Sequence, residues 1–232
     1  MADKPQLTWV GSPNFGYPAG TPGRAGNQPI AIVYHVMEGS LAGTDSWFRN
    51  PQSAVSAHFG VGVNGEIHQY VDVDDTAWAN GIVQAPTWSG LRPGVNPNLY
   101  TVSIEHEGRH ERDGQGDISA FWVPTEPQYA ATLALSRWLV ESLQIEVNAE
   151  HLIPHSAINS VDRTYCPGPG FPFARLISDL SPASWSPVAE IQRLKDRGLI
   201  NSDHSAESAV TWGVFATVLN RVLDRIPNPP SP

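Results

Sequence analysis

The apolar positions in the N-terminal half of the chain fall into runs that predict strands. Residues 30–34 are continuously apolar and are followed by His35, a pattern typical of a buried strand with a polar residue at its exit. Residues 99–105 alternate and are rich in β-branched side chains, so they predict another strand, with Glu105 near its end. Each of these two strands therefore carries one side chain suited to chemistry.

A hairpin, a short helix and a long loop are predicted between those two strands. Residues 58–63 and 66–71 flank Asn64-Gly65, the dipeptide that most strongly predicts a tight β-hairpin. Residues 45–49 allow a short helix with two aromatic side chains. Residues 72–98 show little pattern and predict a loop.

Helical periodicity is clearer in the second half of the chain. Thr125 and Pro127 are start signals for an amphipathic helix that runs to about Leu143. A loop over residues 145–173 follows, and a short helix ends this part of the chain at Leu180. Because strands and helices are interleaved, the pattern favours an α/β sheet over an all-β sandwich.

The same pattern predicts the domain organisation. Residues 1–180 form the main domain, and its residues 1–29, rich in Gly, Pro and Asn, predict an irregular arm on the surface. Residues 181–187 resemble a linker. Residues 188–232 hold two helical patterns, the first ending at Gly198 and the second capped by Thr211. A segment of this size seldom folds alone, so we expect it to dock on the main domain, to pair with another copy or to be a half-module.

Composition and charge exclude several classes of function. The apolar fraction of 41% supports a hydrophobic core, and 21 prolines with 20 glycines indicate many loops. The formal net charge of −9, without a run of Lys or Arg, argues against nucleic-acid binding and against association with an anionic bilayer. No stretch has the length needed for membrane insertion. The pattern gives no indication of oligomeric state.

The N-terminus indicates where the protein is synthesised, and the single cysteine limits the roles that a thiol can have in it. The first residues lack the basic flank and apolar stretch of a signal peptide, so we expect synthesis in the cytoplasm. The single cysteine, Cys166, excludes an intrachain disulfide. It is therefore a buried hydrophobe, a nucleophile or a metal ligand.

His35, His155 and Cys166 could hold a metal ion, but each of them alone is weak evidence for a metal site. A lone His such as His35 or His155 is more often a hydrogen-bonded residue than a ligand, and the ten residues between His155 and Cys166 match no compact zinc motif. Together, two imidazoles and one thiolate form a known catalytic zinc set that leaves a position open for water. The chemistry also needs a carboxylate, which Glu105 could supply; its alternative role is a solvated residue at a sheet edge.

Five short motifs follow one another in residues 28–178. They are Tyr34-His35 at the end of an apolar strand, Val55-Ser56-Ala57-His58-Phe59 before the hairpin, Thr76-Ala77-Trp78, Val102-Ser103-Ile104-Glu105, and His155 followed by Cys166-Pro167-Gly168. In this order they resemble the type 2 N-acetylmuramoyl-L-alanine amidases, the family shared by phage endolysins, bacterial autolysins and peptidoglycan-recognition proteins.

The resemblance implies a fold, a reaction and a site. The fold is a central mixed β-sheet flanked by helices. The reaction is hydrolysis of the amide bond between N-acetylmuramic acid and the L-alanine of the stem peptide in bacterial peptidoglycan. The family's zinc ligands correspond to His35, His155 and Cys166, and its catalytic glutamate corresponds to Glu105. Trp78 and Asn80 are placed where the wall of the family's groove touches substrate.

Two positions depart from the family. A catalytic tyrosine that some members carry before the hairpin histidine is Ala57 here, and a lysine that some carry two residues before the third ligand is Thr164. Proton transfer therefore falls to Glu105, with Arg163 or Thr164 as an oxyanion partner. His58 is then expected to be structural or to support the site from outside the metal ligands.

The expected mechanism uses zinc to activate water and Glu105 to carry the proton. Zinc lowers the pKa of a bound water from about 15.7 toward 7 and polarises the amide carbonyl. Glu105 accepts the proton and returns it to the leaving alanine nitrogen. Glu107, if the strand continues, would share a face with Glu105 and raise its pKa by like-charge proximity.

Three other functions compete with a zinc amidase. A protein that binds muropeptides without cutting them typically lacks the cysteine ligand, and Cys166 is present. A cysteine peptidase with Cys166 as nucleophile and His155 as base fits poorly, because Pro167 predicts a turn whereas a nucleophilic cysteine favours a helix N-terminus or a cationic setting. A structural wall protein with a closed zinc site is the third.

The resemblance extends to the C-terminal segment and to the compartment. Leu199-Ile200, followed by Val210-Thr211-Trp212-Gly213, resembles the small wall-binding modules of Gram-positive phage endolysins. The alternative is a helical pair that packs on the catalytic domain for stability. An endolysin without a signal peptide would stay in the host cytoplasm until lysis and then act on the cell wall.

Overall fold

Two long parallel strands form the centre of the sheet. β2 (Ala31–Val36) and β5 (Thr101–His106) pair along their whole length. All six residues of β2 are buried, because both faces of the strand are covered. Ile32 and Tyr34 point into one hydrophobic cluster, whereas Ala31 and Val33 belong to another on the opposite face.

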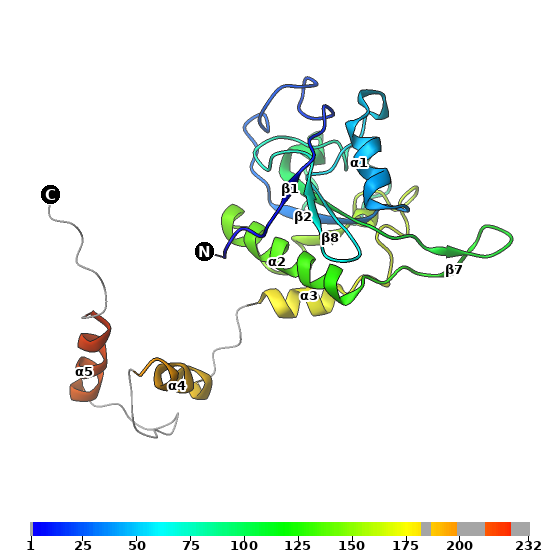
Figure 1. The fold of residues 1–232 in the computed structure, drawn as a ribbon. Helices are drawn as coiled ribbons and strands as arrows, with labels where there is room; N and C mark the ends of the chain where they lie inside the picture. Colours follow the sequence, from blue (N-terminus) through cyan, green and yellow to red (C-terminus); the bar gives the residue numbers. More distant parts are fainter. Residues whose placement is uncertain (1, 182–186, 199–211, 224–232) are drawn as a thin grey trace. The chain divides into compact units, whose positions relative to one another are not determined.

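The computed structural model describes residues 2–181, 187–198 and 212–223 (Figure 1). In this part of the chain the main sheet has the order β1-β4-β3-β5-β2-β8, with only the β3–β4 pair antiparallel. The strands beside the central pair are β1 (Thr8–Trp9), β3 (Phe59–Val61), β4 (Ile67–Gln69) and β8 (Leu152–Pro154). This mixed sheet with flanking helices confirms the expected fold class.

Two helices pack together on one side of the sheet (Figure 1). α2 (Glu126–Leu143) begins at its predicted cap, where the Thr125 hydroxyl oxygen accepts a hydrogen bond from the backbone amide of Gln128 at 3.2 Å. α3 (Phe173–Leu180) follows later in the chain, and both helices contribute leucines to the core. α1 (Leu41–Arg49) contacts β3.

Three 3₁₀ turns and a small second sheet complete the first unit. The turns are η1 (Pro51–Ser53), η2 (Pro97–Tyr100) and η3 (His155–Ala157). β6 (Glu111–Arg112) and β7 (Ile118–Ala120) form an antiparallel hairpin that extends away from the main sheet (Figure 1).

Two parts of the sequence-based prediction need correction. The N-terminal arm is not wholly irregular or superficial, because β1 pairs with β4 and the side chains of Asn14 and Arg24 are buried. The region 145–173 is not all loop, because it contains β8 and η3. Both strands span only two or three residues, which is too short for an apolar period to be recognised.

The chain divides into two units, Met1–Leu180 and Ser181–Pro232. The described part of the second unit consists of α4 (Pro187–Asp196), the expected stop at Gly198 with φ of 63°, and α5 (Trp212–Leu223). Residues 182–186 of the expected linker, Leu199-Ile200 and the Thr211 cap lie outside the described residues. No helix in the described ranges is long and apolar enough to cross a membrane.

Candidate active site

The central strands bring His35 and Glu105 together. The two residues are direct neighbours in the parallel register and lie on the face opposite α2. His35 Nδ1 is 3.7 Å from Glu105 Oε1, and their side chains are 2% and 17% exposed. The carboxyl ends of parallel strands are where open α/β sheets bind ligands, so this pair marks the functional edge of the sheet.

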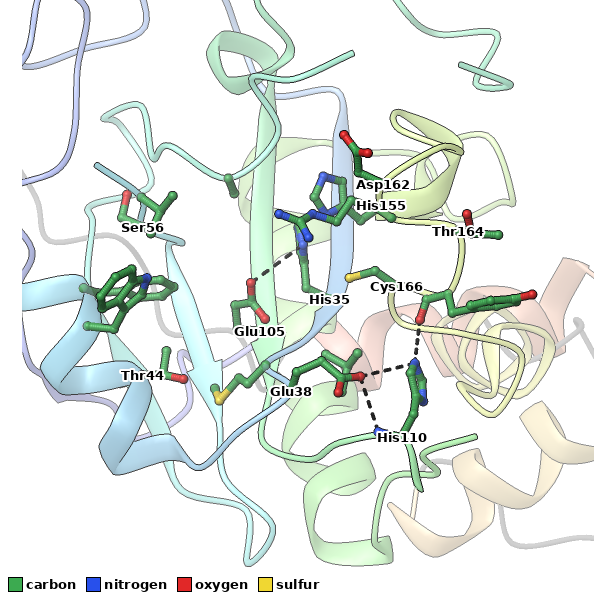
Figure 2. Close-up of a pocket in the computed structure, with 18 of the residues that line it drawn as sticks. His35, Glu38, Thr44, Ser56, Glu105, His110, His155, Asp162, Thr164 and Cys166 are labelled. Carbon is green, nitrogen blue, oxygen red and sulfur yellow. Dashed lines mark hydrogen bonds and ion pairs between the residues drawn. The ribbon is translucent and has the colours of Figure 1, made fainter. Parts of the chain in front are cut away.

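His155 and Cys166 lie close to His35 and come from β8 and the loop that follows it. His155 opens η3 directly after β8, the strand that pairs with β2. Cys166 lies in the following loop, where its carbonyl accepts a hydrogen bond from the amide of Ser156 at 3.0 Å. One potential ligand atom from each of His35, His155 and Cys166 lies within 4.8 Å of the others (Figure 2). We call these three residues the His₂Cys cluster.

The His₂Cys cluster fits a zinc ion. Two imidazoles and one thiol are a donor set that zinc accepts in catalytic sites, with a further position left for water. Burial lowers the pKa of His35 well below its usual range and, with the nearby charge of Arg163, lowers the pKa of His155 to about 4. Both rings are therefore neutral at physiological pH, the form that a metal ligand requires.

Glu105 is held in a setting that favours its protonated form. Burial raises the pKa of Glu105 to about 7, and the positive charge of Arg163 opposes this rise. The expectation that Glu107 raises it is wrong. β5 ends at His106, and the Glu107 carboxylate turns away to accept a hydrogen bond from the amide of Val63 at 3.0 Å.

A cavity of about 620 Å³ opens over the His₂Cys cluster and Glu105. A second cavity of about 300 Å³ adjoins it. Trp78, His155 and Arg163 line both, so the cluster lies where a ligand could extend in two directions. The Trp78 indole is fixed by a hydrogen bond from its Nε1 to the carbonyl of Gly16 at 3.0 Å, and it packs against Tyr17 of the N-terminal arm.

The other expected substrate residues differ in placement. Arg163 is exposed and close enough to affect the pKa of both histidines, so it is well placed to meet negative charge. Thr164 lines the larger cavity, but its hydroxyl donates to the carbonyl of Ser160 at 2.7 Å. Asn80 is fully buried and lines neither cavity, so the structure does not place it for the contact with substrate that we expected.

His58 is a structural residue in this fold. It lines neither cavity, and its Nδ1 accepts a hydrogen bond from the amide of Ser103 at 3.0 Å. Its Nε2 lies 2.8 Å from the guanidinium of Arg24, and burial together with that positive charge lowers its pKa well below the usual range. Ala57 before it is completely buried and cannot take over a tyrosine's role.

Sequence reasoning missed two polar residues in the wall of the larger cavity, Glu38 and His110. His110 Nδ1 accepts from the amide of Trp122 at 3.0 Å, so its proton is on Nε2, which donates to the carbonyl of Tyr165 at 2.7 Å. This bond holds the backbone directly before Cys166 (Figure 2). No sequence signal pointed to His110, because it precedes a hairpin whose strands are too short to show a period.

Comparison with known proteins gives one family. The family described as N-acetylmuramoyl-L-alanine amidase matches residues 25–169, well over half of the chain. N-acetylmuramoyl-L-alanine amidase A of Achromobacter lyticus is 30% identical over 161 residues, which cover 65% of this chain and 82% of that protein. These matches confirm the resemblance predicted from the five motifs.

Solved structures share the fold. A selenomethionine derivative of AmpD is 24% identical with a TM-score of 0.57, and the match covers 77% of this chain and 98% of that one. The endolysin N-acetylmuramoyl-L-alanine amidase LysCS from Clostridium intestinale URNW is 19% identical with a TM-score of 0.50, covering 79% and 100%.

Proposed function

The chain belongs to the N-acetylmuramoyl-L-alanine amidase family and is a peptidoglycan hydrolase, and from this premise we propose that it is a zinc enzyme in which Glu105 carries the proton. His35, His155 and Cys166 would hold the ion. The observation that supports the proposal most is that three suitable donor atoms lie within 4.8 Å of one another, while the half-buried carboxylate of Glu105 lies 3.7 Å from His35 Nδ1.

Zinc bound by the His₂Cys cluster would supply Lewis-acid activation of water and of the lactyl carbonyl. Glu105 Oε1 accepts a proton from the attacking water, whose oxygen bonds to the carbonyl carbon. The same carboxyl then gives the proton to the alanine nitrogen as the carbon–nitrogen bond breaks, so that a carboxylic acid and an amine are formed. A carboxyl with a pKa near the working pH can do both.

Arg163 is the better of the two proposed oxyanion partners. The proton of the Thr164 hydroxyl is already donated to a backbone carbonyl, whereas Arg163 has a permanent positive charge beside both histidines. Positive charge that is positioned before the reaction stabilises the negative charge developing on the carbonyl oxygen. The two adjoining cavities would take the muramoyl and peptide parts of the substrate on either side of the scissile bond.

The substitution Glu105→Gln tests the role of the carboxylate. Gln keeps the shape of Glu but cannot accept the proton, so turnover of a soluble muramyl peptide should fall by about 10²-fold or more while zinc content stays at the wild-type level. Such a loss equals about 2.7 kcal/mol of transition-state stabilisation. Turnover and zinc content are measured on the same preparations.

Glu107→Gln is the matched control, because Glu107 lies two residues away and faces Val63 instead of the cavity. It should keep near-normal turnover. Normal turnover by Glu105→Gln would place the base elsewhere. Loss of zinc from Glu105→Gln would make Glu105 a ligand or a support for one and would contradict the proton role.

The proposal also covers the biological role of the enzyme and the function of its second unit. We propose that the chain is a phage endolysin, which stays in the host cytoplasm until lysis, and that residues 188–232 bind the cell wall. Phe215 and Leu219 support this role, because they lie one turn apart on α5 and are 51% and 44% exposed. The endolysin among the structural neighbours supports the endolysin role of the chain, not the wall binding of this segment.

A further inference from the structure

Asn80 is anchored on the face of the sheet that carries His35. Its side-chain nitrogen donates to Thr101 Oγ1 at 2.9 Å and to Ser103 Oγ at 2.8 Å. Thr101, Ser103 and Glu105 alternate along β5 and therefore share one face. His35 is the neighbour of Glu105 on β2, so Asn80 lies one step along the sheet from His35 on the same face.

The orientation of the Asn80 carboxamide is fixed by its neighbours. The Thr101 hydroxyl donates its own proton to the carbonyl of Pro97 at 2.7 Å, so it can only accept from Asn80. The group facing Thr101 must therefore be the NH₂ of Asn80 and not its oxygen. This places Oδ1 on the other side of the carboxamide.

Two buried polar atoms at this point have no hydrogen bond in the described part of the chain. One is Asn80 Oδ1 and the other is His35 Nε2. Buried polar atoms are almost always paired in folded proteins, so two such atoms on adjacent side chains indicate an interaction. Burial lowers the pKa of His35, and the Asn80 side chain is close enough to the ring to oppose that effect.

We propose that Asn80 is a positioning residue for the zinc ligand His35, whose Nε2–H is accepted by Asn80 Oδ1. The neutral ring then carries its lone pair on Nδ1, the nitrogen that lies 3.7 Å from Glu105 Oε1. Histidine ligands commonly donate their second ring N–H to such a partner, which fixes the tautomer and the ring plane. The inference rests on the proposed zinc function.

Asn80 is needed because Glu105, whenever it is ionised, favours the opposite tautomer. With the proton on Nδ1, His35 would donate toward the Glu105 carboxylate, and the nitrogen nearest that carboxylate would have no lone pair for a cation. An acceptor on the Nε2 side shifts the equilibrium to the form that can bind metal. Asn80 thus acts through His35 and touches neither substrate nor ion.

The test uses the full-length protein in two measurements. The first is a long-range ¹H–¹⁵N correlation spectrum of the metal-free protein with labelled histidine, which reports which ring nitrogen carries the proton. Wild-type His35 should be the Nε2–H form, and Asn80→Ala should move it toward Nδ1–H. The second is the zinc dissociation constant by competition with a chromophoric chelator, which should weaken about 10- to 100-fold in Asn80→Ala.

Val33→Ala is the matched control, because Val33 is fully buried on the same face of β2 and carries no polar group. It should lose stability but keep the wild-type tautomer and zinc affinity. An Nδ1–H tautomer in the wild type, or wild-type zinc affinity in Asn80→Ala, would overturn the proposal. If Asn80→Ala does not fold, the wild-type tautomer alone decides. Failure of the wild type to bind zinc would instead refute the proposed function, and the tautomer would still report on Asn80.

Discussion

At the scale of single residues, Cys166 sets the net charge that a metal ion bound to the His₂Cys cluster would carry. One thiolate and two neutral imidazoles would leave a bound zinc ion with net positive charge, which suits an oxyanion. Burial raises the pKa of the Cys166 thiol, and the nearby Glu105 adds to the rise. A catalytic nucleophile needs the opposite shift, so the cysteine-peptidase alternative is disfavoured.

Replacing a ligand should remove zinc and activity together. A cluster with three protein ligands has none to spare, so Cys166→Ser and His155→Ala should each lower zinc content and turnover in parallel. His68→Ala is a control, because His68 lies on β4, contacts Asp45 of α1 and lines neither cavity. The parallel loss is checked by measuring zinc content and turnover on the same samples of each variant. A fully active, zinc-free Cys166→Ser protein would contradict the ligand assignment.

Individual site residues were predictable where a strand fixed their direction. His35 and Glu105 end recognisable strands, and parallel pairing then places them side by side. Asn80 follows Trp78 in an unpatterned loop, where no period indicates which way a side chain turns. Its burial depends on the hydroxyls of Thr101 and Ser103, which only the folded sheet brings to it.

At the scale of elements, Arg24 joins the N-terminal arm to the sheet. Its buried guanidinium donates to the backbone carbonyls of Val73, Asn98, Leu99 and Thr101 and contacts His58. Burial lowers the pKa of Arg24 to about 10, and nearby aspartates oppose the effect, so the group stays charged at neutral pH. Arg24 thus makes several of the hydrogen bonds that hold the loop-rich arm on the sheet.

Arg24→Ala should destabilise the fold. It leaves several buried carbonyls without a donor, which predicts a decrease of about 3 kcal/mol or more in the free energy of unfolding. Arg24→Lys should recover only part of the lost free energy of unfolding, because one ammonium cannot make all the hydrogen bonds of the guanidinium. Denaturant titration measures both. Arg109→Ala, at an exposed position, should stay within about 0.5 kcal/mol of wild type. A similar small change in Arg24→Ala would show that the arm is held by other contacts.

Elements with a long period were predictable, and so was the β3–β4 hairpin, because Asn64-Gly65 marks its turn although each strand has only three residues. β2, β5, the β3–β4 hairpin and α2 all carry the expected patterns, and Gly65 at φ 91° fits its turn. β1, β6, β7 and β8 contain only two or three residues each. Their strand conformation comes from pairing with a partner and not from local sequence.

At the scale of the whole molecule, the proposed chemistry lies within one unit. The His₂Cys cluster, Glu105 and both cavities belong to residues 1–180. The second unit supplies none of the lining residues in the described ranges. Catalysis and wall binding should therefore be separable.

A chain that ends at Leu180 should keep turnover of a soluble muramyl peptide and lose sedimentation with intact cell walls. Sedimentation is best compared in the Glu105→Gln background, where the walls are not digested during the assay. Thermal unfolding shows whether the shortened chain is folded. Equal wall binding by both lengths would remove the targeting role and favour packing of the helices for stability.

The most direct measurement of the central claim is the chemistry of the ends that the enzyme liberates from purified peptidoglycan. We predict new N-terminal alanines paired with intact muramic acid carboxyl groups, abolished by a chelator and restored by adding zinc. New N-termini at other residues, new reducing sugar ends, or cleavage that survives complete removal of metal would contradict a zinc-dependent muramoyl-L-alanine amidase.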